Sequence, residues 1–371
     1  YDGETLPAEL PGCGRTLLPF SDERVMNRVL EFGNPGGTPV PLRLLKLCAH
    51  PAAALAAVRQ IAFKKPRRIS AAKKAIEALD ARCHFDAAVA VAAPYAGSFA
   101  LAAARFGGKK ASWQMDPYAA NRSYNAPGAF DREKQLLEAL DAVFIAPAMK
   151  QYYAPGAPLE RFAGKAHVLD FPSLVPPPAA PAVTGKSSRL RCVFVGSLYP
   201  ELRTPHYALE LFCALNDPNL ELVFVGGGWE NYPADLLEPY RKILGDRLIV
   251  TGPLPAKQAA EDLAKADVLL SLGNGVNNQV PSKIFEYFAA GRPVLHLAKL
   301  ENDPCRPYFD RWPLALTLLE SEGTGPDVLA RLSAFLAEKG RCRLPFEEAE
   351  RLFESNTPQA AARCLEQTLG G

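Results

Sequence analysis

Short apolar segments alternate with helical patterns along this chain, and the alternation restricts the fold more than any other feature of the sequence. In the second half, segments with the character of buried strands lie at 191–196, 220–228, 246–252, 266–275 and 293–297. Helical patterns separate them at 204–215, 233–244, 256–265 and 281–290. Strands that alternate with helices form parallel sheets with helices on both faces. The pattern therefore predicts an α/β fold with a doubly wound parallel sheet.

The first half repeats this pattern less regularly. Strands are predicted at 86–91, 110–115, 142–146 and 166–171, with a helix at 131–141, a helical pattern at 51–80 and a candidate strand at 16–20. No opening strand with its loop is apparent before residue 80. The chain also begins at Tyr1 and not at Met, which is consistent with a missing natural start and a missing opening strand.

An uncharged stretch at 87–104 is long enough to suggest a membrane span. It consists mostly of alanine and is interrupted by Pro94, Gly97 and Ser98. Weak hydrophobicity and these interruptions favour a buried strand at 87–93, a turn and a packed helix.

A proline-rich stretch at 171–188 separates the two halves and is typical of an extended linker. At 371 residues the chain suits two domains. We predict a Rossmann-like domain over 1–175, a linker over 176–188 and a second Rossmann-like domain over 189–345. A last helix at 346–369, within 346–371, is expected to pack across both domains. Ligands of such sheets bind at the carboxyl ends of the strands.

Charge and cysteine content exclude several classes of protein. The net charge of +2 does not demand a nucleic acid partner. The eight cysteines form no CxxC pair and no metal-type spacing with the five histidines, so we predict no metal site and reduced thiols in a cytoplasmic protein. No GxGxxG follows a strand and no GxxxxGK[ST] occurs, which argues against a dinucleotide oxidoreductase and a P-loop NTPase. No cofactor is predicted.

The stretch NNQVPSKIFEYFAAGRPVL at 277–295 holds the clearest candidate site. On a helix over 281–290, the apolar residues Ile284, Phe285, Phe288 and Ala289 share one face, which predicts its burial. The polar residues Ser282, Lys283 and Glu286 share the other face, just beyond the end of a strand. A helix start attracts phosphate, Lys283 adds positive charge, and Glu286 can accept hydrogen bonds from ribose hydroxyls. The alternative is an ordinary helix cap made by Ser282.

Other loops are expected at the same edge of the sheet. Gly196-Ser197, Gly226-Gly227-Gly228 and Gly252-Pro253 each end a predicted strand, and Arg203 follows the first of them. Glycine lets a ligand approach the backbone, and arginine can bind a diphosphate through two nitrogens. The alternative for each loop is that glycine simply ends a strand.

Taken in order, VGSLYPELRTP, VFVGGG, RLIVTGPLP, ADVLLSLGN and VPSKIFEYFAAGRPVL resemble the donor half of GT-B glycosyltransferases, in particular glycosyltransferase family 4, the group 1 enzymes of envelope polysaccharide synthesis. The resemblance is strong over 189–298 and weaker over 86–175. It implies a GT-B fold, in which two Rossmann-like domains face a central cleft, the first on the acceptor side and the second on the donor side. It also implies a nucleotide diphosphate sugar as co-substrate, UDP-linked on family frequency, and a retaining, metal-independent transfer to a glycan or lipid-linked acceptor.

The same resemblance assigns roles to residues. Glu286 would bind the ribose, and Lys283 and Arg203 would bind the diphosphate and stabilise the leaving group. The complete set of donor-binding candidates is Gly196, Ser197, Gly226, Gly227, Gly252, Asn277, Asn278, Ser282, Lys283 and Glu286. The family often has two glutamates separated by seven residues, and here Asn278 replaces the first of them. A nucleotide-sugar epimerase and a non-catalytic subunit that supports a partner transferase are the alternative functions.

The acceptor side offers fewer candidates. Asp116 follows a predicted strand and is a catalytic or acceptor-binding candidate, and Tyr95 is a second acceptor-binding candidate; the alternatives are an Asp-Pro turn and a packed tyrosine. Residues 63–75 contain six basic residues and no acid. They suit either peripheral contact with an anionic membrane at its inner face or a solvated helix flank. Aromatic residues are not interleaved with these charges, so nucleic acid is not a predicted partner.

Overall fold

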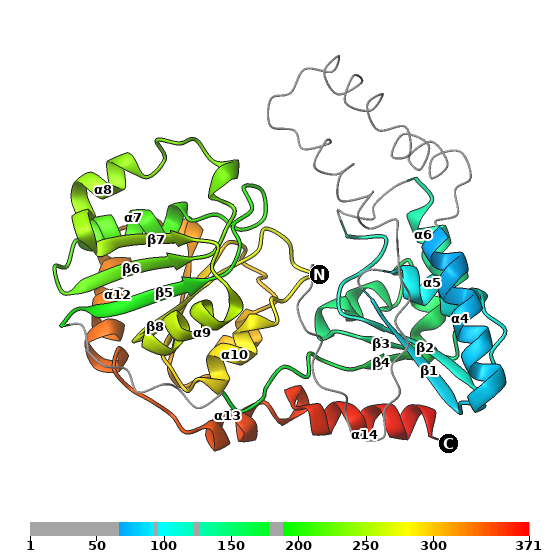
Figure 1. The fold of residues 1–371 in the computed structure, drawn as a ribbon. Helices are drawn as coiled ribbons and strands as arrows, with labels where there is room; N and C mark the ends of the chain where they lie inside the picture. The colour runs from blue at the N-terminus through cyan, green and yellow to red at the C-terminus, as the bar shows by residue number, and fades with distance from the viewer. Residues whose placement is uncertain (1–66, 93–94, 122–126, 178–187, 371) are drawn as a thin grey trace, which may run out of the picture. The chain divides into compact units, whose positions relative to one another are not determined.

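The computed structural model describes residues 67–92, 95–121, 127–177 and 188–370 (Figure 1). The chain divides into two compact units. One takes the chain up to Trp113 together with Gly128–Val143, and the other takes Gln114–Pro127 and Phe144–Gly371. The candidate strand at 16–20 and the first part of the helical pattern at 51–80 lie outside the described residues.

A six-stranded parallel sheet organises the second half of the chain, as the sequence predicts. Its strands are β5 (Leu190–Val195), β6 (Leu220–Val225), β7 (Leu248–Gly252), β8 (Val268–Leu272), β9 (Val294–Ala298) and β10 (Ala315–Leu319), in the order β10-β9-β8-β5-β6-β7. The order reverses direction at β5 and β8, which is the point where open α/β sheets bind their ligands. The sequence analysis identified the first five of these strands and missed β10.

Helices cover both faces of this sheet. They are α7 (His206–Leu215), α8 (Glu238–Leu244), α9 (Ala256–Lys265), α10 (Lys283–Ala289), α11 (Arg306–Phe309) and α12 (Pro326–Lys339). Apolar side chains of α7 and α12 join the strands in one core on one face. On the other face His296 of β9 stacks against Phe309 of α11, with ring centroids 4.2 Å apart. Burial on both faces explains why the central strands are apolar throughout.

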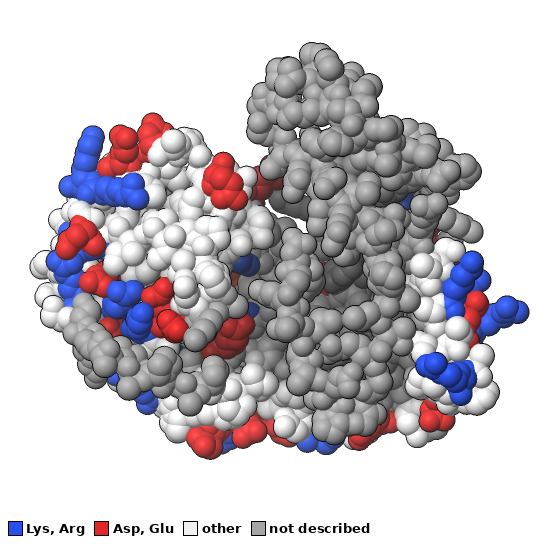
Figure 2. Space-filling view, in the orientation of Figure 1, with Lys and Arg blue, Asp and Glu red and all other residues white. Residues whose placement is uncertain are grey.

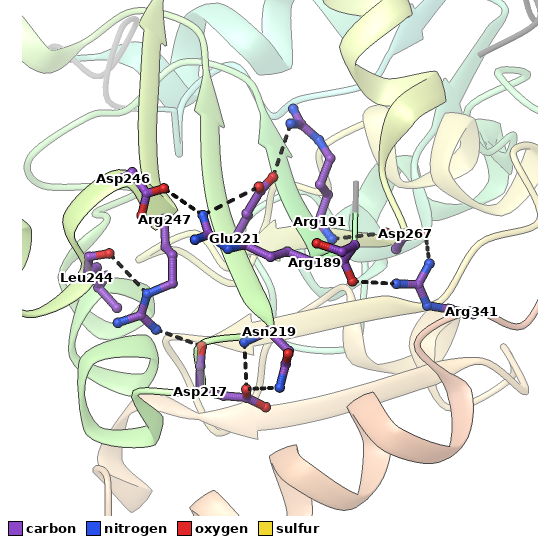
Figure 3. Close-up of polar contacts among 11 residues, drawn as sticks. Arg189, Arg191, Asp217, Asn219, Glu221, Leu244, Asp246, Arg247, Asp267 and Arg341 are labelled. Carbon is purple, nitrogen blue, oxygen red and sulfur yellow. Dashed lines mark hydrogen bonds and ion pairs between the residues drawn. The ribbon is translucent and has the colours of Figure 1, made fainter. Parts of the chain in front are cut away.

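The amino-terminal edge of the six-stranded sheet is closed by ion pairs (Figure 3). Arg189 lies 2.9 Å from a carboxylate oxygen of Asp246, and Arg191 lies 3.2 Å from one of Glu221. Asp267 accepts a hydrogen bond from the backbone N–H of Arg191 and lies 3.7 Å from Arg341. On the face shown in Figure 2, acidic and basic side chains of this half of the chain are intermixed. Charge at this edge is therefore balanced within the protein.

The first half contains a four-stranded sheet in the order β1-β2-β3-β4. Its elements are α4 (Arg67–Cys83), β1 (Ala87–Ala92), α5 (Ala96–Ala103), β2 (Lys109–Gln114), α6 (Ala129–Glu138), β3 (Ala142–Ile145), the short helices η1 (Pro147–Tyr152) and η2 (Glu160–Lys165), and β4 (Ala166–Val168). The predicted strand at 87–93 and the following helix are present, but the strand is not buried: Val89 and Val91 are 37% and 53% exposed. Val89 and Val91 are two residues apart, so both exposed side chains lie on the same face of the sheet. Among the described residues, no helix is both long and apolar enough to cross a membrane.

The single helix predicted at 346–369 is wrong. The structure has α13 (Phe346–Leu352), the short helix η6 (Glu354–Asn356) and α14 (Pro358–Leu369). Pro358 cannot continue a helix through its own N–H, and the hydroxyl of Thr357 accepts a hydrogen bond from the N–H of Ala360, which starts a new helix. The break leaves Phe353 fully buried and stacked on Phe288 of α10, with ring centroids 4.4 Å apart.

Candidate functional site

Three loops meet at the carboxyl-terminal edge of the six-stranded sheet, within the second unit. The N–H of Gly196 donates to the carbonyl of Val225 over 2.9 Å, and the N–H of Leu198 donates to that of Gly227 over 3.0 Å. Farther along the edge, the N–H of Gly275 donates to the carbonyl of Leu202 over 2.7 Å. The loops that follow β5, β6 and β8 are therefore joined through their backbones, as expected for parallel strands whose carboxyl ends share one edge.

Close packing between these loops explains several of the predicted glycines. A Cβ atom at Gly226 would collide with the carbonyl oxygen of Gly196, and Gly226 has a φ of +136°. At Gly228 a Cβ atom would collide with the backbone of Leu198. Gly227 differs, because a Cβ there would make only ordinary contact with Pro253, at 3.6 Å. Gly226 is therefore required by the fold, whereas packing does not require glycine at position 227. Ser197 is exposed beside them.

Arg203 lies in the loop between β5 and α7, and its position is fixed at both ends. Its backbone pairs with Tyr199 through hydrogen bonds of 2.8 and 2.9 Å. Its Nε and Nη2 atoms donate to Oδ1 of Asn274, over 3.1 and 2.8 Å. Burial lowers the pKa of the Arg203 guanidinium. No carboxylate among the described residues lies within ion-pair distance of it, and its Nη1 atom has no hydrogen-bond partner among them. Arg203 is thus a half-buried cation without an acidic partner.

Helix α10 has the two faces that the sequence predicts. Ile284, Phe285, Phe288 and Ala289 are at most 4% exposed. The polar face holds Lys283 and Glu286, joined by an ion pair of 3.0 Å between Nζ and Oε2. Ser282 precedes the helix and is exposed, and its hydroxyl makes no capping hydrogen bond. The helix-cap alternative for Ser282 is therefore not supported by the structure.

Two further features of α10 differ from the prediction or extend it. The helix begins at Lys283 and not at Pro281. Tyr287 is also buried, and its hydroxyl donates to the carbonyl of Val195 over 3.4 Å, which ties the helix to the end of β5. Gly291 follows the helix with a φ of +64°, where a Cβ atom would collide with the carbonyl of Leu344. Glycine at the helix exit is thus required.

Asn278 is buried and makes a hydrogen bond that a glutamate could not make. Its Nδ2 atom donates to the hydroxyl of Tyr152 over 2.7 Å and to the carbonyl of Ala120 over 3.4 Å. A carboxylate could accept a hydrogen bond from the Tyr152 hydroxyl but could not donate to the Ala120 carbonyl. The amide at this position therefore matches its surroundings, and Tyr152 joins the set of residues near the candidate site. The neighbouring Asn277 is exposed.

The two acceptor-side candidates differ in exposure. Tyr95 precedes α5 and is only 2% exposed, so it is a packed side chain. Asp116 follows β2, and burial raises the pKa of its carboxyl. A raised pKa makes this carboxylate a stronger base than an exposed aspartate.

Among the described residues there is no group of three or more histidine, cysteine, aspartate or glutamate side chains that could hold a metal ion.

Sequence reasoning missed a buried polar chain behind the loop that follows β8. Nδ1 of His296 lies 3.1 Å from the hydroxyl of Ser271, and Nε2 lies 3.4 Å from Oδ2 of Asp303. Burial raises the pKa of the Asp303 carboxyl, but the contact with His296 and the N–H of Cys305 lower it below its ordinary value. These residues come from β8, β9 and the loop after β9, so no local sequence pattern predicts that they lie together.

A cavity of about 720 Å³ lies elsewhere in the second unit. It is lined by residues of β10 and its neighbours, among them Trp312, Thr317, Glu322 and Arg331. Arg331 and Glu322 bind each other there, and they also bind the free backbone edge of β10. This cavity is separate from the loops that hold Arg203 and α10.

Residues 189–299 match the family model of group 1 glycosyl transferases. The predicted resemblance to these enzymes is confirmed over this segment, which contains β5 to β9, Arg203 and all of α10. No curated protein matches the sequence.

Solved GT-B structures are similar to most of the chain. Sucrose-phosphate synthase of Thermosynechococcus elongatus is 15% identical with a TM-score of 0.55, over 81% of this chain and 76% of that one. HepE of Anabaena in complex with UDP is 14% identical with a TM-score of 0.55, over 80% and 82%. TarM of S. aureus, in complex with Fondaparinux, alpha-GlcNAc-glycerol and UDP, is 12% identical with a TM-score of 0.56, over 82% and 59%. The fold is therefore GT-B, as predicted.

Proposed function

We propose that this protein transfers a sugar from a nucleoside diphosphate sugar to a glycan or lipid-linked acceptor in cell-surface polysaccharide synthesis. The observation that carries the proposal is Arg203, a half-buried cation whose guanidinium, among the described residues, donates hydrogen bonds to a neutral amide and has no carboxylate partner. A buried charge without a counter-ion is costly, so an anionic ligand is favoured there. Because residues 189–299 match group 1 glycosyl transferases, we propose that this anion is the diphosphate of a nucleoside diphosphate sugar.

In this proposal the protein stabilises the leaving group. When the bond between the sugar and the diphosphate breaks, negative charge grows on the diphosphate. Arg203 and Lys283 offset this charge without a metal ion, and they act in a site where part of the water is excluded. A retaining transfer can use an oxygen of the donor phosphate as the base, so no catalytic acid is needed at Asn278.

Glu286 has two successive partners in this account. Without ligand it pairs with Lys283, one turn along the exposed face of α10. On binding, the Glu286 carboxylate accepts hydrogen bonds from the ribose hydroxyls, and Lys283 turns to the diphosphate. An exposed ion pair of this kind contributes about 0.5 kcal/mol, so its exchange for ligand contacts costs little.

The comparisons also support the choice of UDP as the first nucleotide to test. HepE and TarM are solved with UDP, and UDP-linked donors are the expectation from the family resemblance. On the acceptor side, Asp116 would accept a proton from the acceptor hydroxyl or orient it. We place the reaction in the cytoplasm, with residues 63–75 at the inner face of an anionic membrane. Of these residues 63–66 lie outside the described part of the chain, and Lys73 pairs with Glu77 over 3.6 Å.

A binding assay followed by a transfer assay tests the proposal. Thermal shift with UDP, GDP, ADP and CDP should raise the melting temperature with one nucleotide, because a ligand that binds only the folded state stabilises it. The shift should disappear in Arg203→Ala and persist in Arg363→Ala, a control on α14 whose guanidinium pairs with Glu354 of η6. Stabilisation by none of the four nucleotides would contradict the donor site and favour a non-catalytic subunit.

The transfer assay separates the remaining alternative. Incubation of the enzyme with the matching nucleotide sugars should release nucleoside diphosphate only when a glycan or lipid-linked acceptor is present. Release that does not depend on the acceptor, with formation of the epimeric sugar, would favour a nucleotide-sugar epimerase instead.

A further inference from the structure

The side chain of Asn274 holds the guanidinium of Arg203 in place through hydrogen bonds. A single oxygen, Oδ1 of Asn274, accepts hydrogen bonds from both Nε and Nη2 of the guanidinium. Two donors on one oxygen fix the plane of the guanidinium and leave Nη1 directed away from Asn274. Asn274 is itself 4% exposed, so solvent does not compete for these bonds.

The Asn274 side chain is held in turn by its surroundings. Its Nδ2 atom donates to the carbonyl of Gln279 over 3.3 Å, which assigns the opposite atom, Oδ1, to Arg203. The N–H of Gly275 donates to Leu202, beside Arg203. Gly273 allows this course of the chain, because a Cβ atom there would be 2.6 Å from the carboxylate of Asp303. The amide is therefore preorganised before any ligand arrives.

The chemical character of the holding group is as informative as its position. Several arginines elsewhere in this unit are held by carboxylates, as Arg191 is by Glu221. Arg247 and Arg292 instead donate to backbone carbonyls at the ends of α8 and α9, and Arg247 also donates to the amide oxygen of Asn216. Only Arg203, among these, is held by an amide oxygen alone. An aspartate would accept the same two hydrogen bonds from Arg203 and cancel its charge, and it would lose only the hydrogen bond to the carbonyl of Gln279.

We propose that Asn274 is a positioning residue that orients Arg203 while leaving its positive charge available, and that it thereby favours a nucleoside diphosphate over the monophosphate and the nucleoside. The inference rests on the proposed function, since it assumes that Arg203 faces the diphosphate. It adds a residue and a selectivity that neither the family resemblance nor the helix α10 contains.

The variant Asn274→Asp separates this role from a merely structural one. A structural role predicts that the aspartate, which keeps both hydrogen bonds to Arg203 but loses the one to the Gln279 carbonyl, affects stability alone and preserves binding. Our proposal predicts that, at a temperature where the variant is folded, the Kd for the preferred nucleoside diphosphate rises by about tenfold or more, as expected when a binding cation is neutralised. The Kd for the matching nucleoside should stay within about twofold of wild type, because the nucleoside carries no phosphate.

Isothermal titration calorimetry of wild type and Asn274→Asp with UDP, UMP and uridine measures these Kd values. Loss of the preference for UDP over UMP in the variant supports the proposal. Unchanged UDP binding overturns the proposal and leaves the proposed function in place. If wild type binds none of these ligands and no other nucleoside diphosphate, the proposed function fails first.

A second variant keeps the test decisive if Asn274→Asp does not fold. Asn274→Ala removes the restraint on Arg203 but adds no charge. We expect it to weaken UDP binding by about tenfold and to leave uridine binding unchanged, because an unrestrained guanidinium pays conformational entropy on binding. UDP binding equal to that of wild type in Asn274→Ala overturns the positioning role.

Discussion

The arginines at the two edges of the six-stranded sheet differ in the charge of their partners. At the amino-terminal edge, Arg189 and Arg191 lie against the carboxylates of Asp246 and Glu221 (Figure 3). At the carboxyl-terminal edge, the guanidinium of Arg203 donates hydrogen bonds to the neutral amide of Asn274 and has no carboxylate partner among the described residues. Both edges carry partly buried guanidinium groups, so burial does not separate them. The difference is whether the charge is cancelled inside the protein.

This difference teaches how a stabilising arginine is told from a ligand-binding one. A paired arginine contributes to folding, and its removal leaves a buried carboxylate unpaired. An arginine held by a neutral group keeps a charge that folding does not use, and its removal can even relieve the cost of burial. Substitutions at the two edges should therefore affect different measurements.

The largest effect is expected from Arg203→Ala. We expect the affinity for the preferred nucleoside diphosphate to fall by about 100-fold, equivalent to roughly 3 kcal/mol for a charge-assisted hydrogen-bonded contact. The melting temperature without ligand should not fall. Titration calorimetry and thermal unfolding of the same sample measure both. A folding defect with normal affinity would place Arg203 in the stabilising class and break the comparison.

Arg191→Ala should give the opposite result. It removes the 3.2 Å contact with Glu221, whose side chain is 11% exposed, and the 3.9 Å contact with Asp262. We expect a loss of about 2 kcal/mol in the free energy of unfolding, between the values for exposed and fully buried pairs. Nucleotide affinity, measured well below the melting temperature, should be unchanged. Urea denaturation provides the stability, and Arg363→Ala is a control at an exposed pair.

A smaller effect on binding is expected from Glu286→Ala. The variant loses the contacts proposed with the ribose hydroxyls, and we expect about a tenfold loss of affinity for the ribonucleotide. Stability should change little, because the Glu286 side chain is 51% exposed. A 2′-deoxyribonucleoside diphosphate is the matched ligand. If Glu286→Ala weakens binding of the ribose and deoxyribose ligands equally, the ribose assignment is wrong.

The smallest effect concerns Asp116 and pH. Burial raises the pKa of this carboxyl above its ordinary value, so the folded protein holds the proton more tightly than the unfolded chain. The contribution of Asp116 to stability is therefore greatest below the ordinary pKa and is lost as the pH rises through the raised value. Relative to Asp116→Asn, wild type should lose stability as the pH rises above about 4, the ordinary pKa of aspartate. Equal pH profiles in urea denaturation would show that the carboxyl is not perturbed.

The sequence predicted most of the fold because its strongest signals are local. Five strands of the six-stranded sheet and the buried face of α10 follow from runs of apolar residues and from helical spacing. Strand β10 was missed because its residues 315, 316, 317 and 319 are only half-buried at the sheet edge. The break before α14 was missed although Thr357-Pro358 carries both a helix cap and a helix breaker.

The candidate site was only partly predictable, for a different reason. Arg203, Lys283 and Glu286 were found from residue type and position after a strand. Asn274, Tyr152 and the buried chain of Ser271, His296 and Asp303 depend on contacts between distant segments, and no spacing rule contains them. The predicted glycines show the converse: their pattern was correct, but Gly226 serves the packing of two loops.

The most direct test of the central claim is calorimetric titration of UDP into wild type, Arg203→Ala and Arg191→Ala under identical conditions. The account predicts binding by wild type and Arg191→Ala with the same Kd, and a loss of about 100-fold in Arg203→Ala. If Arg203→Ala bound UDP with the wild-type Kd, the result would contradict the claim that Arg203 binds the diphosphate of the ligand.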